Sequence, residues 1–239
     1  MQKRKVGIYE KCIKRCLDFL LSLLAIIILS PVILITALLV RIKLGGPVLF
    51  CQIRPGKNGK LFRMYKFRSM TNEMDAEGKL LPDEVRLTSF GKKLRATSLD
   101  ELPELFNILK GDMSIVGPRP QLVRDMVFMT SEQNRRHEVR QGLTGLAQIK
   151  GRNTITWEEK LGYDIEYVDH ISFWNDVKII LGTIKSVFAK EGISAEGMET
   201  AEDFGDYLLH GGKINLVEYE NGQYKARELL KEQEQWSEI

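Results

Sequence analysis

The sequence predicts a helix-rich α+β protein that carries an N-terminal membrane segment. Three observations predict it: a long uncharged apolar run near the N-terminus, two short apolar stretches on either side of a turn, and later stretches with helical spacing. The 239 residues suffice for one domain of ordinary size with an appendage. We expect a membrane segment at residues 1–44, a body at 45–200 and an appendage at 201–239.

The apolar run at residues 19–40 contains no charged residue and is long enough to span a bilayer. Basic residues flank both ends, so the positive-inside rule places both ends on the cytoplasmic face. Ser30 and Pro31 stand in the middle, and a proline there removes a backbone donor and bends the helix. A re-entrant helix hairpin that dips into one leaflet and returns fits both observations. A kinked single span is the alternative, because proline is tolerated in such helices.

The next elements are predicted from turn residues and helix signals. Residues 47–50 and 61–67 are expected as short strands around the turn RPGKNGK, followed by a polar loop at 71–88. Helices are expected at residues 89–96, 100–110, 125–139 and 157–167, and a glycine-punctuated loop with one short strand at 142–153. Residues 171–190 have apolar positions at helical spacing, which fits an interfacial amphipathic helix and a core helix equally well.

Charge divides the chain into a basic body and an acidic tail. Residues 196–239 contain 11 acidic and 4 basic residues, a net charge of −7, which leaves +10 for residues 1–195 of a chain whose total is +3. A basic body suits anionic lipids, nucleic acids or phosphorylated substrates. The chain has no aromatic-basic recognition motif, which argues against nucleic acid. Three cysteines without a pairing pattern indicate a reducing compartment, and the absence of C-x-x-C argues against structural zinc.

The stretch SLDELPELFNILKGDMSIVGPRP contains two adjacent acids, Asp100 and Glu101. Ser98 and Glu101 match a capping box, which would only begin a helix. That interpretation places Pro103 past the first helical turn, where its missing N–H removes a helix bond. A helix that begins near Asp100 avoids this loss and places Asp100 at the positive end of the helix, where an ionised carboxylate or a phosphate is favoured.

Several basic residues occur around this acid pair in the sequence. Guanidinium groups match phosphate oxygens in a fork geometry, and Mg²⁺ commonly uses one or two carboxylates together with substrate phosphates. We therefore predict a site for a multiply charged anion, with Asp100 and Glu101 as Mg²⁺ ligands. A carboxylate can also attack phosphorus directly. The predicted binding residues are Lys66, Arg68, Arg95, Arg119, Arg152, Asp164 and Tyr167.

Three stretches, YKFRSM, SLDELPELFNILKGDMSIVGPRP and GLTGLAQIKGRN, stand in this order behind the apolar Ser-Pro segment. In this the chain resembles the bacterial sugar transferase family, the monotopic polyprenol-phosphate phosphoglycosyl transferases, from about residue 9 to about residue 196. Its compact length is most similar to the di-N-acetylbacillosamine-phosphate transferase type of bacterial protein N-glycosylation.

The resemblance implies a reaction and a place for it. Such enzymes transfer a phospho-sugar from a UDP-sugar to a polyprenol phosphate, usually undecaprenyl phosphate, and release UMP. They act at the cytoplasmic face of the bacterial inner membrane, as the first membrane step of glycoconjugate assembly such as exopolysaccharide synthesis. The sugar expected here is an N-acetylated hexosamine derivative. Later glycosyltransferases of the pathway and a second copy of the chain are further candidate partners.

The resemblance also implies roles for single residues. Asp100 would be the nucleophile that forms a covalent phospho-sugar intermediate, and Glu101 would act at the Mg²⁺ site. Arg119 would lie in the active site, with Lys66, Arg95 and Arg152 at matching phosphate-binding positions. The family's membrane break corresponds to Ser30 and Pro31, and its fold is a helix-rich α+β body on a re-entrant helix hairpin.

Two departures and two rival functions stay open at this point. Many members read R-P-G-[IL]-T-G-W-A-Q where this chain has RQGLTGLAQ, with Gln141 and Leu146 at the differing positions. The acidic tail has no counterpart in the family, and we expect the chemical step not to need it. The rivals are a membrane-anchored glycosyltransferase with a metal-binding D-x-D, which does not occur in this chain, and a non-catalytic interaction protein.

Overall fold

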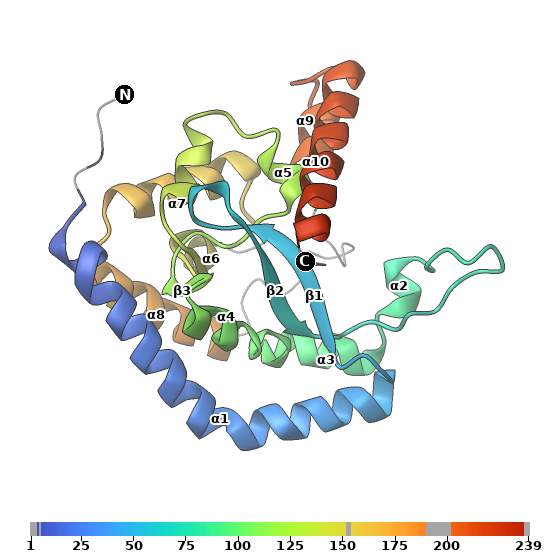
Figure 1. Ribbon diagram of the computed structural model, residues 1–239, viewed down its shortest axis with the longest axis horizontal. Helices are drawn as coiled ribbons and strands as arrows, with labels where there is room; N and C mark the ends of the chain where they lie inside the picture. The colour runs from blue at the N-terminus through green and yellow to red at the C-terminus, as the bar shows by residue number, and fades with distance from the viewer. Residues whose placement is uncertain (1–3, 5, 152–153, 190–201, 237–239) are drawn as a thin grey trace.

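The computed structural model describes residue 4 and residues 6–151, 154–189 and 202–236 of the chain (Figure 1). A long bent N-terminal helix lies along the outside of a helical body that holds two small sheets. Short 3-10 turns at Lys57–Gly59, Leu99–Glu101 and Gln133–Glu138 connect some of the elements. The helices are α1 (Lys14–Leu44, after a π-helical turn at Tyr9–Ile13), α2 (Asp83–Arg86), α3 (Ser89–Ala96), α4 (Glu104–Lys110), α5 (Val123–Met126), α6 (Leu146–Lys150), α7 (Trp157–Asp169), α8 (Phe173–Ala189), α9 (Phe204–His210) and α10 (Leu216–Trp236). The strands are β1 (Leu49–Pro55), β2 (Leu61–Phe67), β3 (Met113–Val116) and β4 (Gln141–Thr144).

Helix α1 bends midway along its length but stays helical throughout, with Pro31 inside it (Figure 1). A helix residue at position 31 would normally donate its N–H to the carbonyl of Ile27, and proline has no N–H to give. The Ser30 hydroxyl donates to that same carbonyl over 2.8 Å. The Ser-Pro pair therefore bends the helix and supplies a substitute hydrogen bond, so the expected break between two helices is a bend within one.

One face of α1 packs on the body along most of its length, from Asp18 to Leu44. The opposite face carries large apolar side chains in the open; Leu34, for example, is 70% exposed. Among the described residues, Tyr9–Leu44 is the one helix long and apolar enough to cross a membrane. An apolar surface of this extent indicates contact with lipid. The other strongly exposed apolar residues of α1 are Leu20, Leu24, Ile27, Ile28, Ile35, Leu38 and Ile42.

The two sheets are an antiparallel hairpin and a parallel pair. Strand β2 occupies the predicted residues, and β1 begins at Leu49 and extends to Pro55, beyond the predicted end. Strands β3 and β4 pair in parallel, so the segments that follow them meet at one edge. The backbones there approach so closely that a side chain at Gly142 would place its Cβ 2.1 Å from the amide nitrogen of Gly117. This contact brings the GPRP and GLTG segments together.

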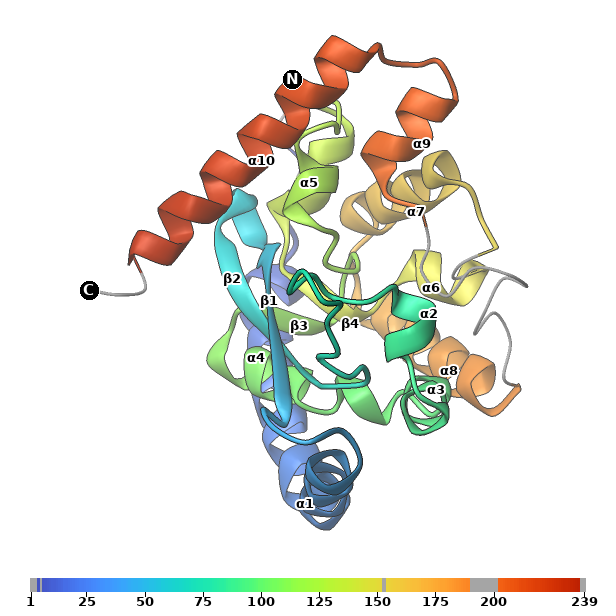
Figure 2. The ribbon, with the colours of Figure 1, turned by 90° about the vertical axis from the view of Figure 1, so that its right-hand side faces the viewer.

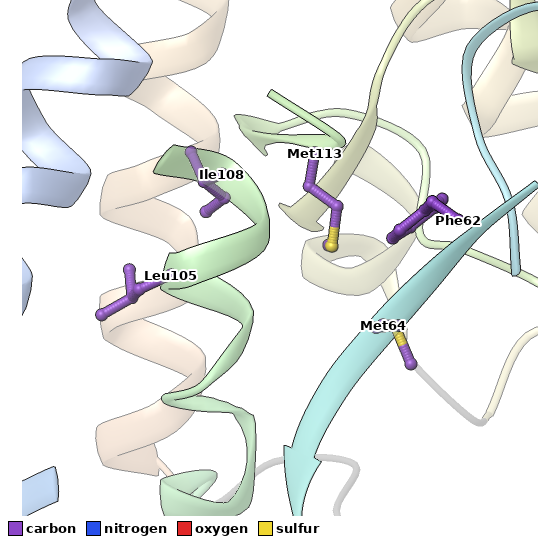
Figure 3. Packing of buried hydrophobic residues seen from close by; sticks show 5 residues of the cluster. All are labelled: Phe62, Met64, Leu105, Ile108 and Met113. Carbon is purple, nitrogen blue, oxygen red and sulfur yellow. The ribbon is translucent and has the colours of Figure 1, made fainter. Parts of the chain in front are cut away.

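The central apolar cluster joins β2, α4 and β3 (Figure 3). Ile108 and Met113 are fully buried in it, and α1 contributes Ala25, Ile26 and Leu29. The membrane helix therefore shares its core with the strand and helix on either side of the acid pair. The remaining members of the buried cluster are Phe62, Met64 and Leu105.

Most predicted helices are present, and one is wrong. Helices α3, α7 and α8 match the expected ranges closely, and the predicted loop at 71–88 contains only the short α2. The continuous helix expected at 125–139 is instead α5 followed by a separate 3-10 turn. Arg136 and His137 are adjacent and both buried, which a surface helix with one wet face does not allow.

The described part of the acidic tail, residues 202–236, is folded and docked. Helices α9 and α10 lie beside α7 and α5 (Figure 2), and Phe204 is 3% exposed in a cluster with Trp157, Leu161 and Met129.

Candidate active site

The acid pair lies in the 3-10 turn Leu99–Glu101, one short connection before α4. Ser98 precedes it in a left-handed conformation (φ 54°), and its side chain makes no capping hydrogen bond. Pro103 is the N-cap of α4, where its missing N–H costs nothing. Neither sequence interpretation is correct, because the α-helix begins at Glu104 and the acid pair belongs to the turn before it. The predicted end at Gly111 is confirmed, with a left-handed C-cap.

Glu101 joins two motifs that are distant in the sequence. Its Oε1 accepts a hydrogen bond from Lys66 Nζ at 2.8 Å and another from Arg119 Nη2. Lys66 comes from β2, and Arg119 from the GPRP loop after β3. The predicted convergence of YKFRSM, the acid pair and GPRP is therefore present around one carboxylate.

Asp100 and Glu101 are adjacent but have opposite electrostatic environments. Burial raises the pKa of Asp100 to about 6, aided by the negative charge of Glu101, while Lys66, Arg119 and Arg95 act to lower it. Burial also acts to raise the pKa of Glu101, but the charges and hydrogen bonds of Arg119 and Lys66 outweigh it and hold that pKa well below its usual range. Glu101 is thus a fixed negative charge, whereas Asp100 titrates near neutral pH.

A third carboxylate, Glu104, belongs to the same cluster and was missed at the sequence level. It is 1% exposed, and its Oε1 lies 3.2 Å from Lys66 Nζ without a hydrogen bond to any partner. Burial raises its pKa to about 7, although Lys66 acts to lower it. The sequence D-E-L-P-E could have indicated Glu104. It stands one helical turn after the acid pair, so its side chain is expected near them.

Two further arginines surround the cluster. Arg95 Nε donates to Ser69 Oγ at 2.9 Å, and its charge acts to lower the pKa of Asp100; its predicted contact with a substrate phosphate stays a prediction. Arg54 was not predicted. Its Nη1 donates to the carbonyl of Pro120 at 3.3 Å, its Nε is buried without a partner, and burial, followed by the charge of Arg119, lowers its pKa to about 10. Two like charges held close together favour an anion between them.

Arg68 lies outside this cluster, and its hydrogen bonds go to backbone carbonyls. It is 5% exposed, and its guanidinium donates to the carbonyls of Leu44 and Gly46 at the C-terminal end of α1. Its contacts indicate a helix-capping role in place of the predicted substrate contact, because the last carbonyls of a helix need donors from elsewhere.

Asp164 and Tyr167 are buried support residues. Asp164 Oδ2 accepts a hydrogen bond from Arg136 Nε at 2.9 Å and forms an ion pair with Nη2 at 2.8 Å; Nη2 in turn donates to the carbonyl of Arg119 at 2.5 Å. The Tyr167 hydroxyl donates to Val116 O at 3.0 Å and contacts Asp176 at 2.9 Å. Their contacts place both residues behind the loop at residues 117–122, called the Arg119 loop below. We therefore find no support for the direct substrate role that the sequence predicted.

The remaining predicted residues divide into two groups. Arg152 lies outside the described residues. The two departures from the family pattern are buried: Gln141 donates to the backbone of Arg136 and Val139, and Leu146 packs in a core cluster with Val116. Both therefore act through packing around the loops and present no side chain to the acid pair.

The carboxylates of this cluster fit a Mg²⁺ ion that is shared with a substrate. In the described part of the chain, no three His, Cys, Asp or Glu side chains form a metal-binding group by themselves. Lys66 and Arg119 both donate to Oε1 of Glu101, and no described residue donates a side-chain hydrogen bond to Asp100. One or two carboxylates completed by phosphate oxygens is the arrangement that Mg²⁺ commonly adopts.

Comparison with known proteins agrees with this arrangement of motifs. A family model described as bacterial sugar transferase matches residues 9–190. A protein of Bacillus subtilis (strain 168) called uncharacterized sugar transferase EpsL is 50% identical over 192 residues, which make up 80% of this chain and 95% of that protein.

Other relatives are longer and carry more specific names. The UDP-glucose:undecaprenyl-phosphate glucose-1-phosphate transferase of Klebsiella pneumoniae is 42% identical over 187 residues, 72% of this chain and 39% of that protein. The UDP-N-acetylgalactosamine-undecaprenyl-phosphate N-acetylgalactosaminephosphotransferase of Aeromonas hydrophila is 38% identical over 192 residues, 75% of this chain and 44% of that protein. The chain thus spans less than half of these two relatives.

Proposed function

The chain belongs to the bacterial sugar transferase family, and we propose that it transfers a sugar phosphate from a UDP-sugar to undecaprenyl phosphate and releases UMP. The observation that carries the proposal is the acid pair with its cations: Asp100 is buried, Glu101 accepts hydrogen bonds from Lys66 and Arg119, and the charge of Arg95 acts on Asp100. A diphosphate in this position would meet three cations, and such preorganised charge stabilises the extra negative charge of a phosphoryl-transfer transition state.

We assign the nucleophile to Asp100. A carboxylate oxygen of Asp100 forms a bond to the sugar-linked phosphorus, and the bond from that phosphorus to the bridging oxygen of UMP breaks. UMP leaves with the bonding electrons, so the product is an acyl-linked phospho-sugar on Asp100. Glu101 stays ionised and hydrogen-bonded to Arg119 and Lys66. That fixed pairing suits Glu101 for holding neighbouring groups in place and suits Asp100 for attack.

The second half of the reaction uses the lipid. An oxygen of undecaprenyl phosphate attacks the same phosphorus, the bond to Asp100 breaks, and the carboxylate is regenerated as the lipid diphosphate sugar forms. Helix α1 shares the core cluster with α4, which follows the acid pair directly. A lipid phosphate at the membrane surface would therefore approach the site along α1, at the cytoplasmic face of the membrane.

Asp100 and Glu101 are the residues that would hold Mg²⁺. When bound, the ion would neutralise part of the diphosphate charge and favour departure of UMP. The residues of the chain itself hold the site together without it, since Lys66 and Arg119 are fixed by Glu101.

For the sugar we propose an N-acetylated hexosamine derivative. The support is the name of the Aeromonas relative, which specifies N-acetylgalactosamine; the Klebsiella relative is named for glucose. A panel of UDP-sugars incubated with membrane-embedded protein and scored for UMP release identifies the donor.

The test of the mechanism omits the lipid acceptor. Wild-type protein with its UDP-sugar and Mg²⁺ should release about one UMP per enzyme. It should also gain the mass of one phospho-sugar on the peptide that contains Asp100. Asp100→Asn keeps the shape but removes the attacking charge, so it should abolish both signals. UMP release that needs undecaprenyl phosphate, without any trapped adduct, would instead support direct transfer with Asp100 as a base or metal ligand.

The same assay separates the rival functions. A glycosyltransferase that moves the sugar alone would release UDP in place of UMP, and its lipid product would carry one phosphate in place of two. A non-catalytic interaction protein would release no nucleotide from any donor of the panel.

A further inference from the structure

The C-terminal helices lie beyond the family-matched residues 9–190, yet they contact the segment that follows the Arg119 loop. Arg124 of α5 forms an ion pair with Asp203 at 2.7 Å, and Trp157 Nε1 donates to the carbonyl of Glu202 at 3.1 Å. The Phe128 ring stacks on Tyr219 of α10 with a centroid distance of 5.9 Å. Figure 2 shows α10 running beside α5. The tail is therefore anchored by polar and apolar contacts together.

Asp125 connects this docked tail to the loop. One of its carboxylate oxygens accepts from the backbone N–H of Phe204 at 2.9 Å, and the other accepts from the N–H of Leu122 at 2.9 Å. Asp125 is 2% exposed, so these two bonds satisfy a carboxylate that water does not reach. A single buried side chain thus ties the start of α9 to the residues just after Pro120.

Among the described residues, three side chains hydrogen-bond to the backbone of the Arg119 loop. Arg136 donates to the carbonyl of Arg119, Arg54 donates to the carbonyl of Pro120, and Asp125 holds Leu122. All three side chains belong to the family-matched residues, but only Asp125 is itself held by the tail, through the Phe204 amide. Loss of the tail contact would leave a buried carboxylate with an unpaired oxygen, and Asp125 would be expected to move to regain a partner.

We propose that α9 and α10 are a positioning element for the Arg119 loop and that Asp125 is the positioning residue through which they act. The proposal rests on the proposed function, in which Arg119 meets the diphosphate. Docking of the tail keeps Arg119 in place for the UDP-sugar, and undocking weakens nucleotide binding. The proposal adds a role in donor binding to the sequence-based expectation that the chemical step itself does not need the tail.

Glycines at the interface offer a way to undock the tail without removing it. A Cβ at Gly222 would lie 2.3 Å from the Phe128 ring, and one at Gly205 would lie 2.5 Å from it. Gly205→Ala/Gly222→Ala therefore creates a clash while it favours helix within α9 and α10. Gly162→Ala is the matched control, because Gly162 is exposed on α7 and its Cβ would meet nothing within 4 Å.

The double variant should show faster hydrogen–deuterium exchange at the Phe204 amide, which reports undocking. The UMP dissociation constant, measured by calorimetry with UMP and Mg²⁺, should rise about 3- to 10-fold, the equivalent of about one hydrogen bond. KM for the UDP-sugar should rise by a similar factor while kcat changes less, because Asp100 stays in its turn and Lys66 still holds Glu101 when Arg119 shifts. Gly162→Ala should match wild type in all three measurements.

Asp125→Asn tests the link without a clash. The amide keeps one acceptor oxygen and presents an NH₂ group to the other backbone N–H, so one of the two bonds is lost. It should raise KM for the UDP-sugar with kcat retained and leave the tail helices folded by circular dichroism. If exchange shows that the tail is undocked while UMP affinity and KM stay unchanged, this inference is overturned and the proposed function is not. A wild type that neither binds UMP nor releases it would instead refute the proposed function.

Discussion

Asp100, Glu101 and Glu104 belong to one short stretch, yet the fold shifts the pKa of Glu101 in the opposite direction to the pKa values of the other two. Glu101 is paired with two cations and stays ionised, whereas burial raises the pKa of Asp100 to about 6 and that of Glu104 to about 7. A nucleophile with a raised pKa is more basic and therefore a stronger attacker once ionised. Glu101 therefore keeps a constant negative charge beside Asp100, whose charge changes with pH.

This arrangement predicts the pH dependence of the reaction. Asp100 attacks as the carboxylate, so kcat/KM for the UDP-sugar should fall as pH decreases through about 6, towards tenfold per unit. Arg95 favours the ionised form, and Arg95→Gln should move this acidic limb to higher pH by about half a unit. Arg227→Gln, an exposed change on α10, is the control. An acidic limb that stays in place in Arg95→Gln would show that Arg95 does not act on Asp100.

Residue types and order in the sequence were enough to predict the cluster of Lys66, Arg95 and Arg119 around the acid pair. They were not enough to separate Arg68 from Lys66, because the two stand two residues apart in YKFRSM, and residues i and i+2 of a strand point to the same face. Lys66 meets Glu101, and Arg68, just past the strand end, turns back to the end of α1. Charge alone does not reveal which neighbour a side chain will find.

At the scale of elements, Arg68 explains how α1 ends. Gly45 follows the helix with φ 76°, and the carbonyls of Leu44 and Gly46 receive hydrogen bonds from the buried guanidinium. The β hairpin thereby caps the membrane helix with a side chain from its second strand's end. A cap of this kind fixes the direction in which the chain leaves the membrane surface.

Removing this cap should cost stability more than catalysis. Arg68→Ala leaves two carbonyls without their donor, which should lower the free energy of unfolding by about 2–4 kcal/mol. The folded fraction should keep kcat/KM for the UDP-sugar within about threefold, since Arg68 touches none of the acid pair. Thermal unfolding in detergent and UMP release measure the two quantities, with the exposed Arg227→Ala as control. A large rise in KM at unchanged stability would return Arg68 to the substrate site.

Element types were predictable where one local signal dominated, as for α7, which begins with a Thr156 capping box, and α4, which ends at Gly111. The start of α4 and the turn that holds Asp100 were not, because Ser98 adopts a left-handed conformation that only the surrounding packing selects. The docked tail was not predictable either, since α9 and α10 depend on an apolar cluster with Trp157 that forms only in the folded chain.

At the scale of the whole molecule, the packing of α1 bears on topology. Its middle part contacts the core cluster through Ile26 and Leu29, and its C-terminal part contacts Phe67 and Leu94 through Ile33 and Ala37. A helix that crossed the bilayer would touch a body on one side of the membrane at one end only. We therefore propose that α1 enters one leaflet and returns, with both of its ends on the cytoplasmic face.

The native cysteines allow a test of this topology. Cys12 precedes the apolar run, Cys51 follows it, and both are exposed. A membrane-impermeant maleimide should label both in inverted membrane vesicles and neither in intact spheroplasts, in single-cysteine variants that retain only Cys12 or only Cys51. Ser30→Ala/Pro31→Ala restores the backbone donor and should straighten α1. The straightened helix is long enough to span, so labelling of the Cys12-only form should shift to the opposite side. Wild-type Cys12 and Cys51 labelled from opposite sides would establish a single span, and the proposed approach of the lipid phosphate along α1 would then have to be abandoned.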